Sequence, residues 1–171
     1  KLIIDISLVG EVEKKRLALR SGARPGDLVF VTGTIGGSGK GRHLDFVPRV
    51  DEARLITQKH RINAMIDVSD GLLLDLGRIL SASNVGARLF QNAVPLSPDA
   101  RSFDAAVREG EDFELLFTMS LPEAKRFLGK TLARMKTPVT LIGVVTDARK
   151  GFVLSTEKGE KRLRPGGYLH F

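Results

Sequence analysis

Three aspartates interrupt the apolar segment AMIDVSDGLLLDL, at positions Asp67, Asp70 and Asp75. Isolated carboxylates are rarely buried without partners, so each of them needs a function or a binding partner. Asp67 and Ser69 would lie on one face of an extended strand and would emerge together at its end. Asp75 lies about 140° from Asp70 around an ideal helix, so we expect it to be a helix-surface or structural residue.

The end of this strand allows two interpretations. A helix that begins at Gly71 would direct unpaired N–H groups toward Asp67 and Asp70, and such donors stabilise phosphate oxygens. Magnesium prefers carboxylate oxygens and commonly bridges one or two of them to substrate phosphates. Alternatively, Ser69 or Asp70 caps the helix and Asp67 forms a hydrogen bond within a turn. The spacing leaves both the metal–phosphate site and the capped turn open.

The glycine-rich loop TGTIGGSGKG is similar to a phosphate-binding P-loop but lacks two of its defining residues. The P-loop pattern requires Gly five positions before the Gly of the Gly-Lys pair, and Ser or Thr after the Lys. Those positions hold Thr34 and Gly41 in this chain. We therefore expect no P-loop, and the segment is either a flexible loop near a ligand or an ordinary connection.

Acidic side chains also crowd the start of a later strand, in the stretch EGEDFE. A charge cluster of this size is typical of a solvated loop, but Glu111 and Asp112 could instead receive hydroxyl, amine or cationic groups of a ligand. Tyr168, the only tyrosine, either packs on the core or stacks on a ligand ring. The three histidines have no metal-ligand spacing, so we expect no zinc site.

Apolar periodicity and turn residues predict short strands and helices that would position these side chains. The expected strands comprise residues 2–12, 28–32, 64–68, 87–90, 113–117, 139–145 and 152–155. The expected helices comprise residues 51–62, 71–83, 99–108 and 122–135. Asp51 is the expected cap of the first helix, and Pro122 lies in the first turn of the last. Because strict βαβ alternation is missing, the predicted fold class is α+β.

Composition limits the possible partners and compartments. The 171 residues carry a formal charge of +7, yet the basic residues are scattered and aromatic residues are only 6% of the chain. This pattern favours a solvated basic surface over a nucleic-acid site, so we expect no nucleic-acid partner. The chain has no cysteine and no apolar run near the roughly 20 residues of a membrane span, so we expect a cytoplasmic protein without a membrane partner.

Four motifs together resemble the C-terminal half of the thiamine-monophosphate kinase family, within the superfamily of aminoimidazole ribonucleotide synthetase and selenophosphate synthetase. They are RSGARPGD with VTG, IDVSDGL followed by DL, GEDFEL, and the terminal GYLHF. The motifs occur in the family's order and extend from near the first residue to the last. The resemblance implies an α+β domain in which a mixed sheet is flanked by helices.

The resemblance also implies an activity, which is ATP-dependent transfer of a phosphoryl group to thiamine monophosphate, giving thiamine diphosphate. Magnesium would be the metal and ATP the co-substrate. The implied site residues are Asp67 and Asp70 as magnesium ligands, Ser69 and Arg20 as ATP contacts, and Glu111, Asp112 and Tyr168 at the thiamine end. Catalysis would rest on positioning and electrostatics, and no covalent nucleophile is expected.

One departure from the family concerns length. Residues 1–171 correspond to a single C-terminal domain, and the family's N-terminal half, with further aspartate clusters and the homodimer interface, is not in this sequence. We therefore expect little or no kinase activity from the chain alone. The alternatives are a noncatalytic nucleotide- or ligand-binding module of the same fold, a related ATP-dependent synthetase, and a basic nucleic-acid binder.

Overall fold

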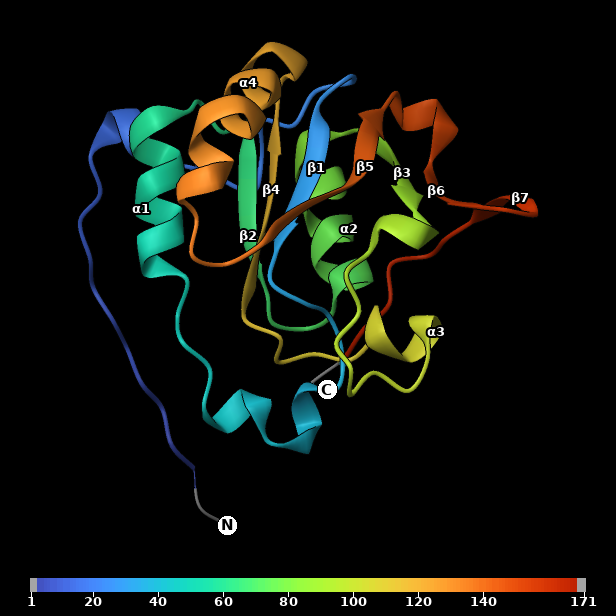
Figure 1. Cartoon of the computed structure of the whole chain (residues 1–171), viewed down its shortest axis with the longest axis horizontal. Coiled ribbons are helices and arrows are strands. Elements are labelled where there is room, and N and C mark those ends of the chain that lie inside the picture. Colours follow the sequence, from blue (N-terminus) through green and yellow to red (C-terminus); the bar gives the residue numbers. More distant parts are fainter. Residues whose placement is uncertain (1–2, 169–171) are drawn as a thin grey trace.

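A seven-stranded mixed sheet runs through the computed structural model, which describes residues 3–168 (Figure 1). Its strand order is β2-β4-β1-β5-β3-β6-β7. The strands are β1 (Leu28–Thr32), β2 (Ala64–Val68), β3 (Gly86–Phe90), β4 (Glu114–Met119), β5 (Val139–Thr146), β6 (Phe152–Thr156) and β7 (Gly159–Arg162). Neighbouring strands are antiparallel except β3 and β6, which are parallel. The predicted α+β class with a mixed sheet flanked by helices is confirmed.

Helices cover both faces of the sheet. They are α1 (Val50–Lys59), α2 (Leu72–Ser83), α3 (Phe103–Ala106) and α4 (Leu121–Arg126), and α4 continues through a π-helical segment η5 (Phe127–Thr131) into the 3-10 helix η6 (Leu132–Arg134). No described helix combines the length and the apolar character needed to cross a membrane.

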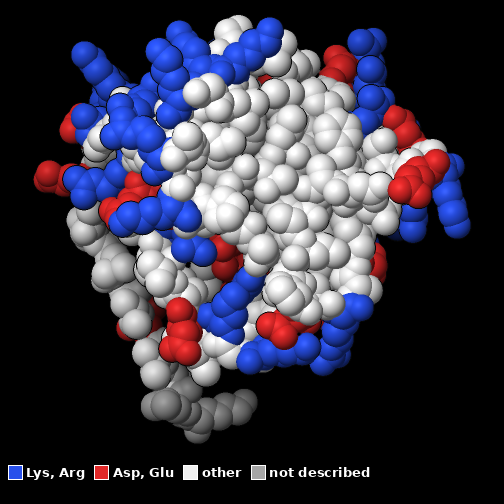
Figure 2. All heavy atoms as spheres, viewed as in Figure 1, with Lys and Arg blue, Asp and Glu red and all other residues white. Residues whose placement is uncertain are grey.

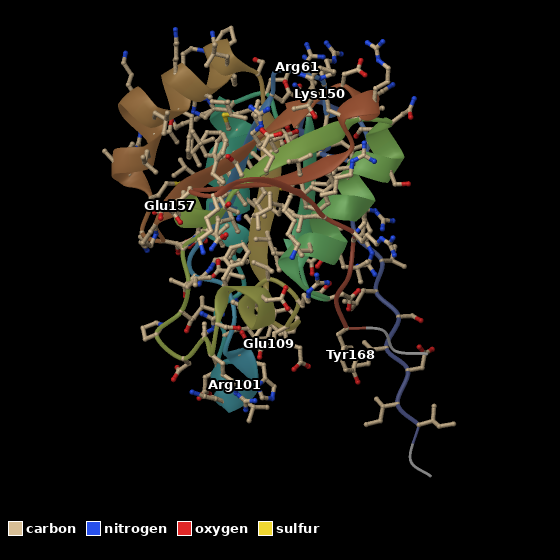
Figure 3. All side chains as sticks on the ribbon, turned by 90° about the vertical axis from the view of Figure 1, so that its right-hand side faces the viewer. Arg61, Arg101, Glu109, Lys150, Glu157 and Tyr168 are labelled. Atoms are coloured by element: carbon tan, nitrogen blue, oxygen red, sulfur yellow. The ribbon has the colours of Figure 1, made fainter. Side chains whose placement is uncertain are left out.

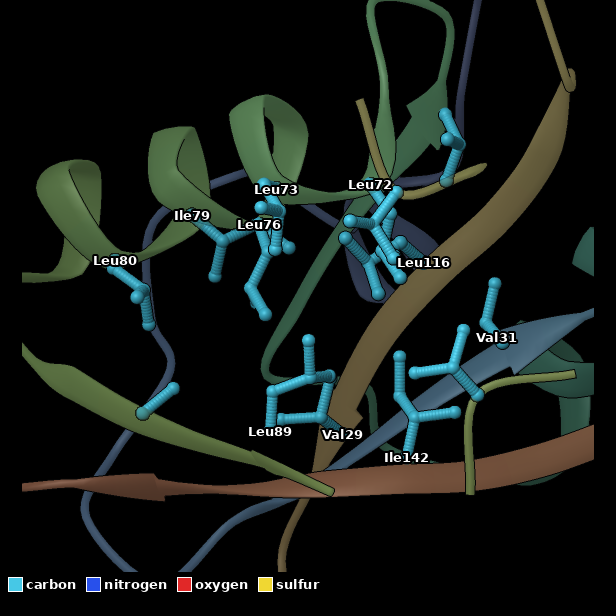
Figure 4. Packing of buried hydrophobic residues seen from close by; sticks show 14 of the residues in the cluster. Val29, Val31, Leu72, Leu73, Leu76, Ile79, Leu80, Leu89, Leu116 and Ile142 are labelled. Atoms are coloured by element: carbon cyan, nitrogen blue, oxygen red, sulfur yellow. The ribbon is translucent and has the colours of Figure 1, made fainter. Parts of the chain in front are cut away.

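Alternation along the central strands explains the two-sided covering. In β1, Val29 and Val31 point toward α2 and pack with Leu72, Leu76 and other buried residues (Figure 4). Phe30 points the opposite way and stacks on Phe117 of β4, with ring centroids 5.5 Å apart, in a second cluster that contains α1 and α4 residues. Because both faces of these strands are buried, their sequences read as continuous apolar runs.

Several predicted elements are wrong. The strand predicted over residues 2–12 is wrong: residues 3–13 pair with no described strand, and their apolar side chains are exposed. Residue 2 lies outside the described residues. Of the helix predicted over residues 99–108, only α3 forms. Asp51 is not the cap of α1, because Arg49 precedes that helix and Asp51 lies inside its first turn. Strand β7 is not predicted because its four residues are all exposed and have no apolar alternation. The predicted strand 64–68 coincides with β2.

Candidate functional site

Three segments that are distant in the sequence meet where β2 ends and α2 begins. The N–H of Glu111 donates to the carbonyl of Ser69 at 2.8 Å, and the N–H of Tyr168 donates to the carbonyl of Asp70 at 2.9 Å. The N–H of Phe113 donates to the carbonyl of Val68 at 2.8 Å and thereby prolongs the pairing of β2 with β4. The turn after β2, the acidic stretch and the tail therefore form one backbone-bonded unit.

Glycines permit this close approach. A Cβ atom at Gly110 would lie 2.6 Å from the Ser69 carbonyl oxygen, and one at Gly167 would lie 2.0 Å from the Asp70 carbonyl oxygen. Both distances are shorter than van der Waals contact, and the obstructing atoms belong to the backbone. Beside them, Glu111 adopts a left-handed conformation with φ 65°, which is uncommon for a residue with a side chain. Such strained positions are often found at functional sites.

A cavity of about 520 Å³ opens against this unit. Its lining combines opposite charges with one aromatic ring, supplied by Lys40, Arg101, Arg108, Glu109, Glu111 and Tyr168 among others. Arg101, Glu109 and Tyr168 lie toward the same end of the molecule in Figure 3, whereas Arg61 and Lys150 lie toward the other. A cavity with cationic, anionic and aromatic walls can hold a small ligand that carries groups of both charges.

Asp75, in the first turn of α2, binds the backbone of the turn between β2 and α2. One of its carboxylate oxygens accepts from the N–H groups of Ser69 and Asp70, each at 3.0 Å, and the other binds Arg78 at 2.5 Å. Burial raises the pKa of Asp75, against the opposing effects of the Asp70 N–H and Arg78. The expectation of a structural residue agrees with this position, but a helix-surface location is wrong because Asp75 is fully buried.

The acidic stretch is not a solvated loop. Asp112 accepts from the N–H of Gly36 at 3.0 Å, from the hydroxyl of Ser38 at 2.5 Å and from Arg42 at 2.5 Å. Glu114 is bound by two nitrogens of Arg49, at 2.7 and 2.8 Å. The side chains of both acids are almost fully buried. Burial raises the pKa of Asp112, and the hydrogen bond to Glu114 raises the pKa of Arg49.

The glycine-rich loop uses its donors inside the protein. Besides the Gly36 N–H bound to Asp112, the N–H of Gly37 donates to Glu109 at 2.8 Å. In a P-loop, equivalent N–H groups hold phosphate oxygens. Here protein carboxylates occupy two of these donors, which is a physical reason to exclude the P-loop function, as the sequence pattern also indicates. The loop instead contributes Gly37 and Lys40 to the wall of the cavity.

The structure brings some of the predicted site residues together and separates others. Glu111 and Tyr168 line the cavity, whereas Asp112 faces the glycine-rich loop. The backbone carbonyl of Arg20 accepts a hydrogen bond from the hydroxyl of Ser83, the last residue of α2. Ser69 lies three residues before Leu72, the first residue of α2. Twelve helical residues span about 18 Å, so Arg20 and Ser69 lie at opposite ends of α2.

Asp67 and Asp70 point to different sides of strand β2. By alternation, Asp67 shares the face of Met65, which packs under α1 and α4. Asp70 binds Arg78 of α2 at 2.6 Å, on the opposite face. Within residues 3–168, no group of three His, Cys, Asp or Glu side chains is placed to hold a metal ion. The residues present therefore fit magnesium only where a single carboxylate, Asp67 or Asp70, shares an ion with phosphate oxygens.

Sequence reasoning missed the arginines that organise this region. Arg78 binds both Asp70 and Asp75, and its position three residues after Asp75 was a detectable helical pairing signal. Arg42 and Arg49 bind acids 70 and 65 residues further along the chain. No local spacing indicates those two pairs.

The domain class follows from the fold, the site and a family comparison together. The family model for the C-terminal domain of AIR synthase related proteins matches residues 24–155, so the chain belongs to this family. Within it, the chain is similar to the thiamine-monophosphate kinase of Rhodopirellula baltica, with 41% identity over 180 residues that cover 99% of this chain and 55% of that protein. The chain spans little more than half the length of that relative.

Solved structures agree with this placement. AaThiL complexed with AMPPCP and TMP superposes with a TM-score of 0.68 and 30% identity, covering 90% of this chain and 54% of that one. The hydrogenase maturation protein HypE of E. coli superposes with a TM-score of 0.72 at 19% identity, covering 89% of this chain and 54% of HypE. The likeness to HypE supports the fold alone.

Proposed function

We propose that the chain is the C-terminal domain of an ATP-dependent kinase that phosphorylates thiamine monophosphate to thiamine diphosphate. The observation that carries this proposal is that Glu111 and Tyr168, which line one cavity of mixed charge, are hydrogen-bonded to the backbone of the Ser69–Asp70 turn. The similarity to a thiamine-monophosphate kinase, and to a structure bound to AMPPCP and TMP, supports the same activity. The residues of this domain would bind and orient the two phosphorylated molecules.

We infer a role for each of the candidate site residues. Tyr168 is exposed beside the cavity and would stack on an aromatic ring of the substrate, while the Glu111 carboxylate would attract a positive charge on that substrate. Asp112 would act indirectly, by holding the glycine-rich loop against the cavity. Ser69 would contact ATP beside the turn. Arg20, at the far end of α2, would reach only a nucleotide or subunit surface on that side.

Magnesium would neutralise charge on the phosphoryl group during transfer. Because they point to different sides of β2, Asp67 and Asp70 would each supply one ligand to a magnesium ion on its own side, with substrate phosphates and carboxylates from the rest of the kinase completing the coordination. We propose that the remaining half of such a kinase forms the homodimer interface and that the enzyme works in the cytoplasm. The chain by itself would then have little or no kinase activity.

The test compares Asp67→Ala and Asp70→Ala with Asp147→Ala in the longer kinase that contains this domain. The first two variants should lower kcat by about 100-fold or more because each removes a ligand of the charge-neutralising metal. Asp147 lies in the exposed connection after β5, and its variant should retain normal turnover. Circular dichroism should show the same fold in all three. Near-normal magnesium-dependent activity in either site variant would refute the metal assignment, and phosphorylation of other substrates alone would refute the function.

A further inference from the structure

Basic side chains gather on one surface of the molecule although they come from separate parts of the sequence. In Figure 2 they concentrate at the upper left, over the region that Figure 1 assigns to α1 and α4. The α1–α4 basic surface is defined here by six exposed residues that line two neighbouring grooves: Lys15, Lys59, Arg61, Arg54, Arg134 and Lys136.

The first groove lies between the end of α1 and the segment near residues 15–18. Lys15, Lys59 and Arg61 line this groove of about 550 Å³, and its described lining contains no acidic residue. The second groove, of about 290 Å³, runs between α1 and the residues after α4, where Arg54 faces Arg134 and Lys136. Gln58 of α1 lines both grooves, so the two sets of cations lie next to each other.

Of the acids near the grooves, Glu13 pairs with Arg16, which lines the first groove but is not one of the six cations. Glu52 is buried and accepts from the hydroxyl of Thr137 at 2.5 Å. Glu123 is also buried, and it is bound by His60 and Arg126. Asp51 is the exposed acid in the described lining of the second groove. The cations at the end of α1 stabilise its dipole, but that effect concerns only the last turn and leaves Arg134 and Lys136 unexplained.

We propose that the α1–α4 basic surface binds the phosphate backbone of a nucleic-acid duplex without reading its base sequence. A row of cations along grooves matches a regular row of phosphates, which supplies most of nonspecific affinity. The described groove linings contain no Phe, Tyr or Trp for base stacking, so a single strand is a poorer match. This inference is independent of the proposed kinase function, and Arg61 lies at the opposite end of the molecule from Tyr168 (Figure 3).

The proposal departs from the expectation of no nucleic-acid partner. That expectation rested on the scatter of basic residues along the sequence. Residues near positions 15, 60 and 135 come together only because α1 and α4 lie side by side over one face of the sheet (Figure 1).

Fluorescence anisotropy of the full chain with a mixed-sequence 20-base-pair duplex tests the proposal. Neutralising about four phosphates predicts that affinity falls about 150-fold between 50 and 200 mM KCl. The variant Lys59→Glu/Arg61→Glu/Lys136→Glu should weaken binding by at least about 30-fold at 50 mM KCl. The control Lys150→Glu/Lys158→Glu/Lys161→Glu makes the same charge change at exposed positions near β6 and β7, and it should weaken binding by less than about 3-fold.

A neutral variant, Lys59→Gln/Arg61→Gln/Lys136→Gln, should weaken binding in the same direction by less, and circular dichroism should confirm folding of every variant. The proposal is overturned if the wild-type chain does not bind the duplex at 50 mM KCl, or if binding does not depend on salt. Equal losses in the Glu variant and its control would show attraction to net charge alone. Binding to phosphatidylserine vesicles without binding to the duplex would assign the surface to membranes.

Discussion

Asp75 connects two backbone donors and one guanidinium through a single buried side chain. The N–H groups of Ser69 and Asp70 cannot pair within β2 or α2, because they lie in the turn between them. Both N–H groups donate to the same carboxylate oxygen of Asp75. Arg78 binds the second carboxylate oxygen of Asp75 and also binds Asp70. The conformation of the candidate magnesium-binding turn therefore depends on a residue outside the cavity.

Replacing Asp75 with Ala should lower the free energy of unfolding by about 3 kcal/mol, because two N–H groups and Arg78 lose their partner. Urea unfolding monitored by circular dichroism measures this change. Asp5→Ala is the control, since Asp5 is exposed in the irregular N-terminal segment, and its effect should stay below about 0.5 kcal/mol. An equally small effect of Asp75→Ala would show that the turn does not depend on this carboxylate.

The loop of residues 33–49, between β1 and α1, is the element that closes one side of the cavity. Arg42 pairs with Asp112, Arg49 pairs with Glu114, and Phe46 stacks on Phe113 with ring centroids 4.3 Å apart. All three contacts join the loop to the start of β4. The only helices in the loop are the short 3-10 helices η2 (Ser38–Lys40) and η3 (Arg42–Leu44), and these charge pairs and the ring stacking hold it against the start of β4.

Arg49→Met should destabilise the protein by about 2 kcal/mol, because Glu114 would remain buried with only the hydroxyl of Thr32 as a partner. The double variant Arg49→Met/Glu114→Met should recover at least half of that loss, since an apolar pair of similar size replaces the ion pair. Trypsin should cleave the single variant faster at Lys40 and Arg42. A double variant less stable than Arg49→Met would contradict this expectation, because it would show that Glu114 is not the source of the lost stability.

Across the whole molecule, the sheet separates two hydrophobic clusters. A network of polar side chains borders the hydrophobic cluster beneath α1 and α4. His60 Nδ1 lies 2.7 Å from Glu123, and His60 Nε2 lies 2.6 Å from the hydroxyl of Thr131 in the π-helical segment. Burial opposes ionisation of Glu123, but hydrogen bonds from His60 and Arg126 keep its pKa below the usual value. This network of polar side chains links the end of α1 to the continuous helix that begins with α4.

Stability should therefore depend on pH through Glu123. Its pKa is lower in the folded than in the unfolded chain, so its contribution is present above the unfolded pKa and is lost as pH falls through the folded pKa. Glu123→Gln should destabilise the protein at pH 7 and progressively less below about pH 4.5. Glu11→Gln, at an exposed residue, should show no such trend in urea unfolding. A Glu123→Gln effect of constant size from pH 3 to pH 7 would contradict this linkage.

Local patterns predicted the elements that have a clear apolar rhythm. The prediction succeeded for β1 and β2, which are short apolar runs bounded by turn residues, and for α2, whose apolar residues repeat with the helical period. It failed for residues 3–13, whose apolar character matches a strand but which find no partner strand among the described residues. A strand requires a neighbour for its hydrogen bonds, and the sequence of one segment does not reveal whether that neighbour exists.

The sequence by itself determined the strand–turn–helix around Asp67 and Asp70, the failure of the P-loop pattern, and the motifs that resemble a kinase family. These depend on residue type and short spacing. Tertiary structure alone decided that Asp75 is buried, that Asp112 and Glu114 are buried and paired, that the tail lies against the Asp70 turn, and that basic residues from separate segments line neighbouring grooves. The physical reason is that the environment of a charge is set by its neighbours in space, and here most of those neighbours are 60 or more residues away in the chain.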